Sequence, residues 1–138
     1  MTSNKKLVID LDTTISITKN GDYKNSVPVM PVVEKMREYK ELGYEIVIFS
    51  SRNMRTYNGD IGKINVHTLP IILDFLEKYS IPHDEVIVGK PWCGFGGMYV
   101  DDRAVRPSEF IKMTENDLQS LLSQEESFVK AHDSEQIL

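Results

Sequence analysis

Short apolar runs that alternate with helical patterns constrain the fold of this 138-residue chain most strongly. Three runs lack the polar alternation of a half-exposed strand and therefore predict buried strands, as in a sheet covered on both faces. They cover residues 5–11, 45–49 and 85–88. Apolar residues recur at helical spacing between them, first after Pro31 and again over residues 69–79. Strands that alternate with helices predict an α/β fold: a Rossmann-like three-layer α/β/α arrangement with a central, mainly parallel sheet.

The remaining segments predict smaller features of the same fold. Residues 15–29 contain an Asn-Gly-Asp turn signal, which predicts a small hairpin or flap. The polar stretch 53–66 predicts a long loop, a kind of segment that is usually functional or disordered. Residues 98–100 predict a fourth short strand after a glycine-rich segment. An amphipathic helix is expected over residues 114–132, with Thr114 as its N-cap.

Length and composition indicate one domain that spans residues 1–138. The formal net charge of −5 and the lack of a basic stripe argue against a nucleic-acid partner. The single cysteine, Cys93, excludes an internal disulfide and fits a reducing cytoplasm. The sequence shows no secretory signal and no apolar run of membrane-spanning length, so we expect a cytoplasmic protein with no membrane contact.

Polar side chains with catalytic potential follow each of the four predicted strands. They are Asp10 and Asp12, then Ser50, then Lys90, and finally Asp101 and Asp102. Ligands of open parallel sheets bind beyond the carboxyl ends of the strands, where these residues are expected. Asp10 and Asp12 are like charges held close together, so the site needs a cation or a raised pKa on one of them. Each residue alone fits a turn former, a capping hydroxyl or a solvated lysine, but four ordered sets are hard to attribute to chance.

The ordered motifs resemble those of the haloacid dehalogenase (HAD) superfamily, whose members are mostly phosphotransferases. The motifs are Asp-Leu-Asp-Thr-Thr at 10–14, Ile-Phe-Ser at 48–50, Gly-Lys-Pro at 89–91 and Val-Asp-Asp at 100–102. The resemblance covers nearly the whole chain up to about Phe110. The stretches 49–55, 62–65 and 89–94 are similar to a small branch of phosphatases of capsule or polysaccharide biosynthesis.

The resemblance implies a role for each catalytic side chain. Asp10 would be the nucleophile that attacks phosphorus and forms an aspartyl-phosphate. Asp12 would protonate the leaving alkoxide and then take a proton from the hydrolytic water. Ser50 would donate a hydrogen bond to a phosphoryl oxygen, with Ser51 able to exchange roles with it, and Lys90 would balance the developing charge.

The resemblance also implies a Mg²⁺ cofactor held by oxygen ligands. The protein ligands would be the Asp10 carboxylate, the backbone carbonyl of Asp12, and a carboxylate from Asp101 or Asp102. Asp102 is favoured because it occupies the later position at the strand end, and Asp101 is close behind. One of these two acids would pair with Arg103 while the other binds the metal.

The chain departs from the family pattern at Thr13, where glycine is common, and the gaps between motifs are too short for a cap domain. A capless site is open, so we expect a bulky substrate or a lid from a neighbouring subunit of a homo-oligomer. Loop 53–66 and the helix over 114–132 are the candidate contacts. Predicted substrate-binding residues, for which surface salt bridges or packing are the alternative, are Thr14, Ser51, Arg52, Arg55, Trp92 and Arg103.

The leading hypothesis is a Mg²⁺-dependent phosphatase that acts on a small phosphorylated metabolite, with a sugar phosphate as the favoured substrate by resemblance. A 5′-nucleotidase-type phosphatase is the alternative within the enzyme class. A receiver-like phosphoacceptor module gathers similar groups, but it places an acidic pair at its first strand and its acceptor alone at a later one. A catalytically idle interaction subunit has no chemical reason to retain every charged group.

Overall fold

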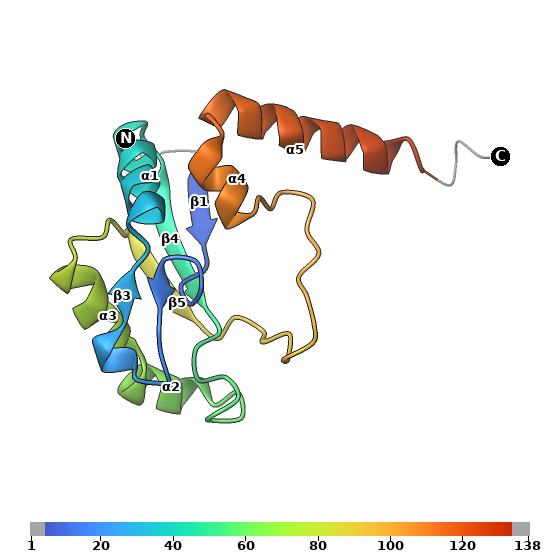
Figure 1. Cartoon of the computed structure of the whole chain (residues 1–138). Coiled ribbons are helices and arrows are strands. Elements are labelled where there is room, and N and C mark those ends of the chain that lie inside the picture. Colours follow the sequence, from blue (N-terminus) through green and yellow to red (C-terminus); the bar gives the residue numbers. More distant parts are fainter. Residues whose placement is uncertain (1–4, 134–138) are drawn as a thin grey trace. The chain divides into compact units, whose positions relative to one another are not determined.

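The computed structural model describes residues 5–133 (Figure 1). By their internal contacts these residues form two compact units, divided after Trp92. The positions of the two units relative to one another are not determined, so each is described by itself.

The first unit is built around a parallel sheet whose described strands have the order β1-β4-β5. The strands are β1 (Lys6–Ile9), β4 (Glu45–Ser50) and β5 (Glu85–Val88). Val8 lies opposite Val47 in the β1–β4 ladder, and Ile48 lies opposite Val86 in the β4–β5 ladder. The three buried runs predicted from the sequence are therefore strands, and the Rossmann-like α/β arrangement is confirmed.

Three helices connect the strands of this sheet (Figure 1). They are α1 (Met30–Glu41), α2 (Ile61–His67) and α3 (Leu69–Lys78). Pro31 lies in the first turn of α1, and Gly43 follows its last turn with φ +95°, a left-handed conformation that glycine adopts without strain. The sequence predicted both of these helix boundaries.

The expectation of a loop over residues 53–66 is wrong at its C-terminal end, where α2 begins. The Asp60 side chain accepts a hydrogen bond from the backbone N–H of Lys63 at 3.2 Å and so caps the first turn of α2. Ile64 is fully buried and anchors the helix. The N-cap and the packing of this short helix against α3 and β5 stabilise it in a stretch without a continuous helical pattern.

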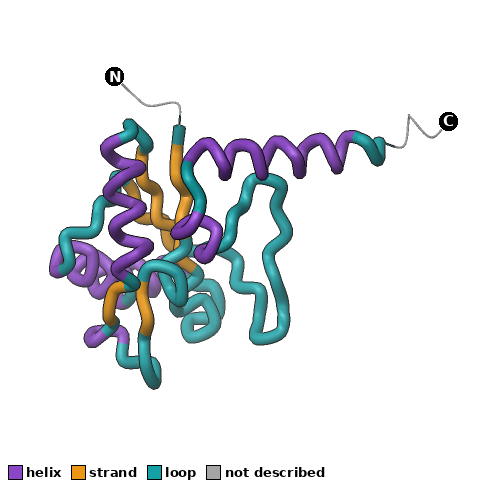
Figure 2. The backbone as a smooth tube through the Cα atoms, turned by 45° about the horizontal axis from the view of Figure 1, so that its top comes forward, coloured by secondary structure: helices purple, strands orange, loops and turns teal. Residues whose placement is uncertain are grey.

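Helices of the first unit cover the sheet face that carries Ile9, Ile46 and Ile48, all of which are buried. Both crossovers step in the same direction across the sheet, so right-handed connections place α1 and the α2–α3 pair on the same face (Figure 2). On the opposite face, Val8 and Ile87 are 59% and 44% exposed, although the apolar runs predicted burial on both faces.

A small flap follows β1, as the turn signal predicted. It consists of β2 (Ser16–Ile17), a 3-10 turn η1 (Tyr23–Asn25) and β3 (Val27–Pro28). The two strands pair antiparallel, with Ile17 opposite Val27. A hydrogen bond of 2.6 Å between the Thr18 and Ser26 hydroxyls ties the two arms of the flap together.

The second unit contains a long irregular segment and two helices, α4 (Pro107–Lys112) and α5 (Glu115–Lys130). Thr114 caps α5 as predicted: its hydroxyl accepts a hydrogen bond from the Asp117 backbone N–H at 3.1 Å. The strand predicted over residues 98–100 is wrong, because these residues pair with no strand in the described part of the chain. Three apolar residues after a glycine-rich stretch do not form a strand without a ladder partner.

Within residues 5–133, no helix has both the length and the apolar character needed to cross a membrane.

Candidate active site

The turn that follows β1 carries Asp10 and Asp12 on a rigid backbone. Leu11 and Ile15, which lie on either side of the polar residues 12–14, are fully buried and anchor the turn in the core. The Leu11 carbonyl accepts hydrogen bonds from the backbone N–H groups of residues 14, 15 and 16 at 3.2, 2.8 and 3.0 Å. With the backbone fixed in this way, both carboxylates project from defined positions at the carboxyl end of the sheet.

Thr13 has a left-handed backbone conformation, with φ +63°. Its N–H donates to the Ser16 carbonyl at 2.7 Å and closes the turn. Left-handed geometry costs an L-residue about 1–2 kcal/mol, and a β-branched side chain is especially unfavourable there. The structure thus gives the physical reason why glycine suits this position and why Thr13 is a departure.

Asp10 is held by a hydroxyl and a cation. The Thr14 Oγ1 donates to Asp10 Oδ2 at 3.1 Å, and the Lys90 Nζ lies 3.5 Å from Asp10 Oδ1. The Asp10 side chain is 33% exposed and that of Lys90 is 19% exposed. Asp10 is therefore oriented on both sides and still open to solvent, and Thr14 acts on Asp10 in this structure.

Lys90 owes its position to the end of β5. Its backbone N–H donates to the Ser50 carbonyl at 3.1 Å, which continues the β4–β5 pairing beyond the last strand residue. Gly89 precedes it with φ +89°, and a Cβ there would lie 2.6 Å from the Ile61 Cδ1. The left-handed backbone favours glycine at this position, and a Cβ there would require the flexible end of the Ile61 side chain to shift.

Ser50 is 1% exposed, and its hydroxyl accepts a hydrogen bond from the Arg52 backbone N–H at 3.0 Å. This contact is the local capping role considered for the residue. The hydroxyl proton is still available to donate, so the predicted bond from Ser50 to a phosphoryl oxygen stays a prediction.

Asp12 forms a two-pronged ion pair with Arg52. The Arg52 Nε donates to Asp12 Oδ2 at 3.1 Å, and its Nη2 donates to Asp12 Oδ1 at 2.8 Å. The Arg52 side chain is 1% exposed, whereas that of Asp12 is 33% exposed. The Ser16 hydroxyl adds a long contact of 3.4 Å to the same carboxylate. Arg52 was predicted to bind substrate, but the structure directs its guanidinium to Asp12.

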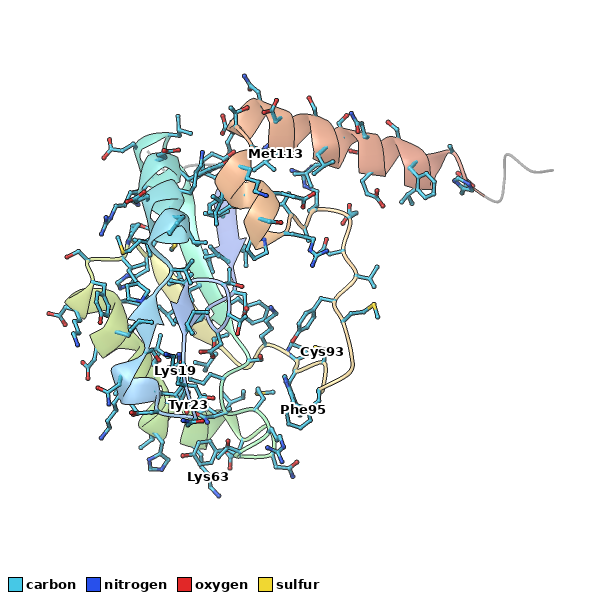
Figure 3. All side chains as sticks on the ribbon, in the orientation of Figure 1. Lys19, Tyr23, Lys63, Cys93, Phe95 and Met113 are labelled. Carbon is cyan, nitrogen blue, oxygen red and sulfur yellow. The ribbon has the colours of Figure 1, made fainter. Side chains whose placement is uncertain are left out.

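Two residues near Asp12 were missed by sequence reasoning, Ser16 and Tyr23. Tyr23 lies in the flap (Figure 3), and the centre of its ring is 4.3 Å from the Arg52 Cζ. Its isolation as an aromatic residue within the polar segment 15–29 was the available signal.

Other predicted substrate-binding residues of the first unit lie in its loops. Ser51 is half-buried at the start of the loop after β4, and its carbonyl accepts a hydrogen bond from the Met54 backbone N–H at 3.1 Å. Arg55 is exposed in the same loop, and Trp92, at the end of the unit, is 38% exposed.

Asp101, Asp102 and Arg103 are exposed residues of the second unit. The backbone N–H of Arg103 donates to Asp101 Oδ1 at 2.8 Å, and this bond is the main reason that the pKa of Asp101 lies below its ordinary value. Asp101 thus closes a local turn through its carboxylate. The expected division of labour, with Asp102 as the metal ligand, stays a prediction.

The donor set of the first unit suits a hard cation. The Asp10 carboxylate and the Asp12 backbone carbonyl are oxygen donors, and Mg²⁺ commonly takes one or two carboxylates together with waters and substrate phosphate. Within the described residues, no cluster of three or more histidine, cysteine or acidic side chains could hold a metal. A Mg²⁺ ion held by these two oxygens together with waters stays a prediction.

Fold and site together define this chain as a Rossmann-like α/β protein with paired carboxylates and cations at the carboxyl ends of its strands. A crystal structure of an MCSG target from Vibrio cholerae is 55% identical in sequence, with a TM-score of 0.86. The alignment covers 88% of this chain and 98% of the Vibrio cholerae chain. The chain belongs to the same family as that protein.

Two further solved structures match the chain at much lower similarity. One, the structure of a Pnkp1/Rnl/Hen1 complex, is 21% identical with a TM-score of 0.48 over 78% of this chain and 34% of that one. Another, of the Pnkp1/Rnl/Hen1 RNA repair complex, is 20% identical with a TM-score of 0.46 over 66% and 27% of the chains. No protein-family model and no curated protein sequence matches the chain.

Proposed function

We propose that this protein is a Mg²⁺-dependent phosphatase of the HAD type that hydrolyses a small phosphorylated metabolite through an aspartyl-phosphate. The observation that carries the proposal is the pair of carboxylates on one rigid turn. Asp10 lies beside the cation of Lys90, and Asp12 is held separately by Arg52. Two acids with different partners are suited to different roles, one as nucleophile and one as proton carrier.

In the first step, an Asp10 carboxylate oxygen attacks phosphorus and the bond from phosphorus to the ester oxygen breaks. The protonated Asp12 carboxyl donates its proton to the departing alkoxide. In the second step, the Asp12 carboxylate accepts a proton from water, which attacks phosphorus and breaks the bond to Asp10. The products are the alcohol and inorganic phosphate, and both carboxyl groups return to their initial states.

The surrounding groups stabilise the charge that spreads over the phosphoryl oxygens. Lys90 would contribute a positive charge and Ser50 a hydrogen bond. The Asp10 carboxylate, the Asp12 carbonyl and a carboxylate from Asp102 or Asp101 would hold the Mg²⁺. When bound, the ion would reduce the repulsion between Asp10 and an anionic substrate.

We further propose a sugar phosphate of capsule or polysaccharide biosynthesis as the substrate, in the cytoplasm. The motif resemblance supports the substrate class, and the lone Cys93 supports a reducing compartment. A net charge of −5 supports a free small molecule over a nucleic acid as the partner. A nucleoside monophosphate is the alternative substrate, and a homo-oligomer would supply a lid for the open site.

The decisive experiment measures phosphate release from a panel of sugar phosphates and nucleoside monophosphates, with Mg²⁺ and with a chelator. We expect metal-dependent turnover that is concentrated on one sugar phosphate. Turnover concentrated on nucleotides would instead identify a nucleotidase. A long-lived aspartyl-phosphate on Asp10 without turnover would contradict the phosphatase and favour a receiver-like phosphoacceptor.

A further inference from the structure

We propose that Arg52 is a positioning residue that fixes the orientation of Asp12 for proton transfer, and that Tyr23 of the flap in turn holds Arg52. The inference rests on the proposed function, in which Asp12 carries the proton. It replaces the prediction that Arg52 binds substrate. The Arg52 side chain is 1% exposed, so its charge is directed to the protein rather than to an arriving anion.

The contact between Arg52 and Asp12 restrains rotation as well as position. The Nε and Nη2 of Arg52 donate to different oxygens of the Asp12 carboxylate, at 3.1 and 2.8 Å. A guanidinium fork bound in this way holds the carboxylate plane, which a single hydrogen bond does not. Proton transfer depends on the direction of the carboxyl oxygen, because the proton must travel within hydrogen-bond reach of the leaving group.

Tyr23 holds the guanidinium from the flap. The ring centre lies 4.3 Å from the Arg52 Cζ, within range of a cation–π contact. The Ser26 hydroxyl donates to the Tyr23 carbonyl at 3.0 Å and fixes the 3-10 turn that presents the ring. Through Arg52, the conformation of the flap can therefore affect the orientation of Asp12.

Steady-state kinetics test the positioning role on the best substrate of the phosphate-release panel. We expect Arg52→Met to lower kcat about 10- to 100-fold while KM changes less than about threefold. Arg52→Lys would recover little of the loss, because an ammonium cannot form the same fork. A rise in KM with unchanged kcat would instead assign Arg52 to substrate binding and overturn the proposal.

Matched variants separate the flap contact from general damage. Tyr23→Phe retains the ring and is expected to keep kcat within about twofold, whereas Tyr23→Leu lowers it severalfold. Arg37→Met is the control: Arg37 is exposed and donates to the Tyr79 carbonyl at 3.1 Å, and kcat should not change. Equal activity of the Phe and Leu variants would overturn the role of Tyr23.

A double-mutant cycle of unfolding gives a readout that needs no activity. The variants are Arg52→Met, Asp12→Ala and both together, and the quantity is the equilibrium constant of unfolding. If the two residues acted independently, the double variant would change the unfolding equilibrium constant by the product of the two single effects. We expect its unfolding equilibrium constant to be about tenfold smaller than that product implies. Independent effects would contradict the pairing itself. Strong coupling between Arg52 and Asp12 in a protein that turns over no compound would contradict the proposed function but not the pairing. A failure of the proposed function is therefore distinguishable from a failure of the pairing.

Discussion

Two acidic pairs lie at the ends of predicted strands, and only one of those strands forms. Asp10 and Asp12 follow β1, which pairs with β4 along its whole length and continues into a turn anchored by buried Leu11 and Ile15. Asp101 and Asp102 follow residues 98–100, which are 52–92% exposed and form no strand in the described chain.

The difference shows where the geometry of a strand-end motif comes from. Each carboxylate of the first pair has a side-chain partner from a distant part of the sequence, Lys90 or Arg52. In the second pair, Asp101 accepts a hydrogen bond from the backbone N–H of Arg103, two residues away. A paired strand and a buried core next to the motif bring its side chains close to residues from distant parts of the sequence. The motif residues by themselves form only local turns.

The largest effect is expected at Asp10. Asp10→Asn removes the nucleophile and should lower phosphatase kcat by at least about 10³-fold, while the fold is retained. Phosphate release under saturating Mg²⁺ measures the loss. Asp101→Asn is the matched change in the second pair, and an equally large loss there would break the contrast between the pairs.

The core behind the first motif should be the next most sensitive feature. Leu11→Ala removes a fully buried side chain and should lower the free energy of unfolding by about 2–4 kcal/mol. Val100→Ala, at a position 92% exposed, should change it by less than about 0.5 kcal/mol. Denaturant unfolding of both variants tests the comparison. A large loss in the Val100 variant would show that residues 98–100 are packed in solution.

Within the second pair, a smaller and unequal effect is expected. If Asp102 is the metal ligand, Asp102→Asn should raise the Mg²⁺ concentration for half-maximal activity by about 10- to 100-fold. Asp101→Asn should raise it less, because the Asp101 carboxylate already closes a local turn. The measurement is the activity of both variants as a function of Mg²⁺ concentration. A larger increase for Asp101→Asn than for Asp102→Asn would assign Asp101 as the metal ligand.

The smallest effect is expected at Thr13. Thr13→Gly should raise the free energy of unfolding by about 0.5–1 kcal/mol, because it relieves left-handed strain at φ +63° and loses part of that gain to chain entropy. Thermal unfolding measures the gain. Thr56→Gly is the control, because Thr56 is exposed and its backbone is not in the left-handed conformation. This change should not stabilise the protein.

Local patterns predicted most of the first unit, since each depends on residues close in sequence. Buried runs predicted β1, β4 and β5, and the Asn-Gly-Asp signal predicted the flap. In the second unit, Thr114 predicted the start of α5. The same reasoning missed α2 and α4 and predicted a strand over 98–100 that does not form. Short elements carry little periodicity, so their formation depends on a cap or on a partner strand.

The sequence by itself determined which chemical groups stand at the strand ends and in what order. The tertiary structure decided their partners. It set Lys90 against Asp10 at the end of β5, and it buried Arg52 against Asp12 with the Tyr23 ring beside the guanidinium. The physical reason is that a side chain's identity is local, whereas its burial and its charged neighbours depend on segments separated by tens of residues.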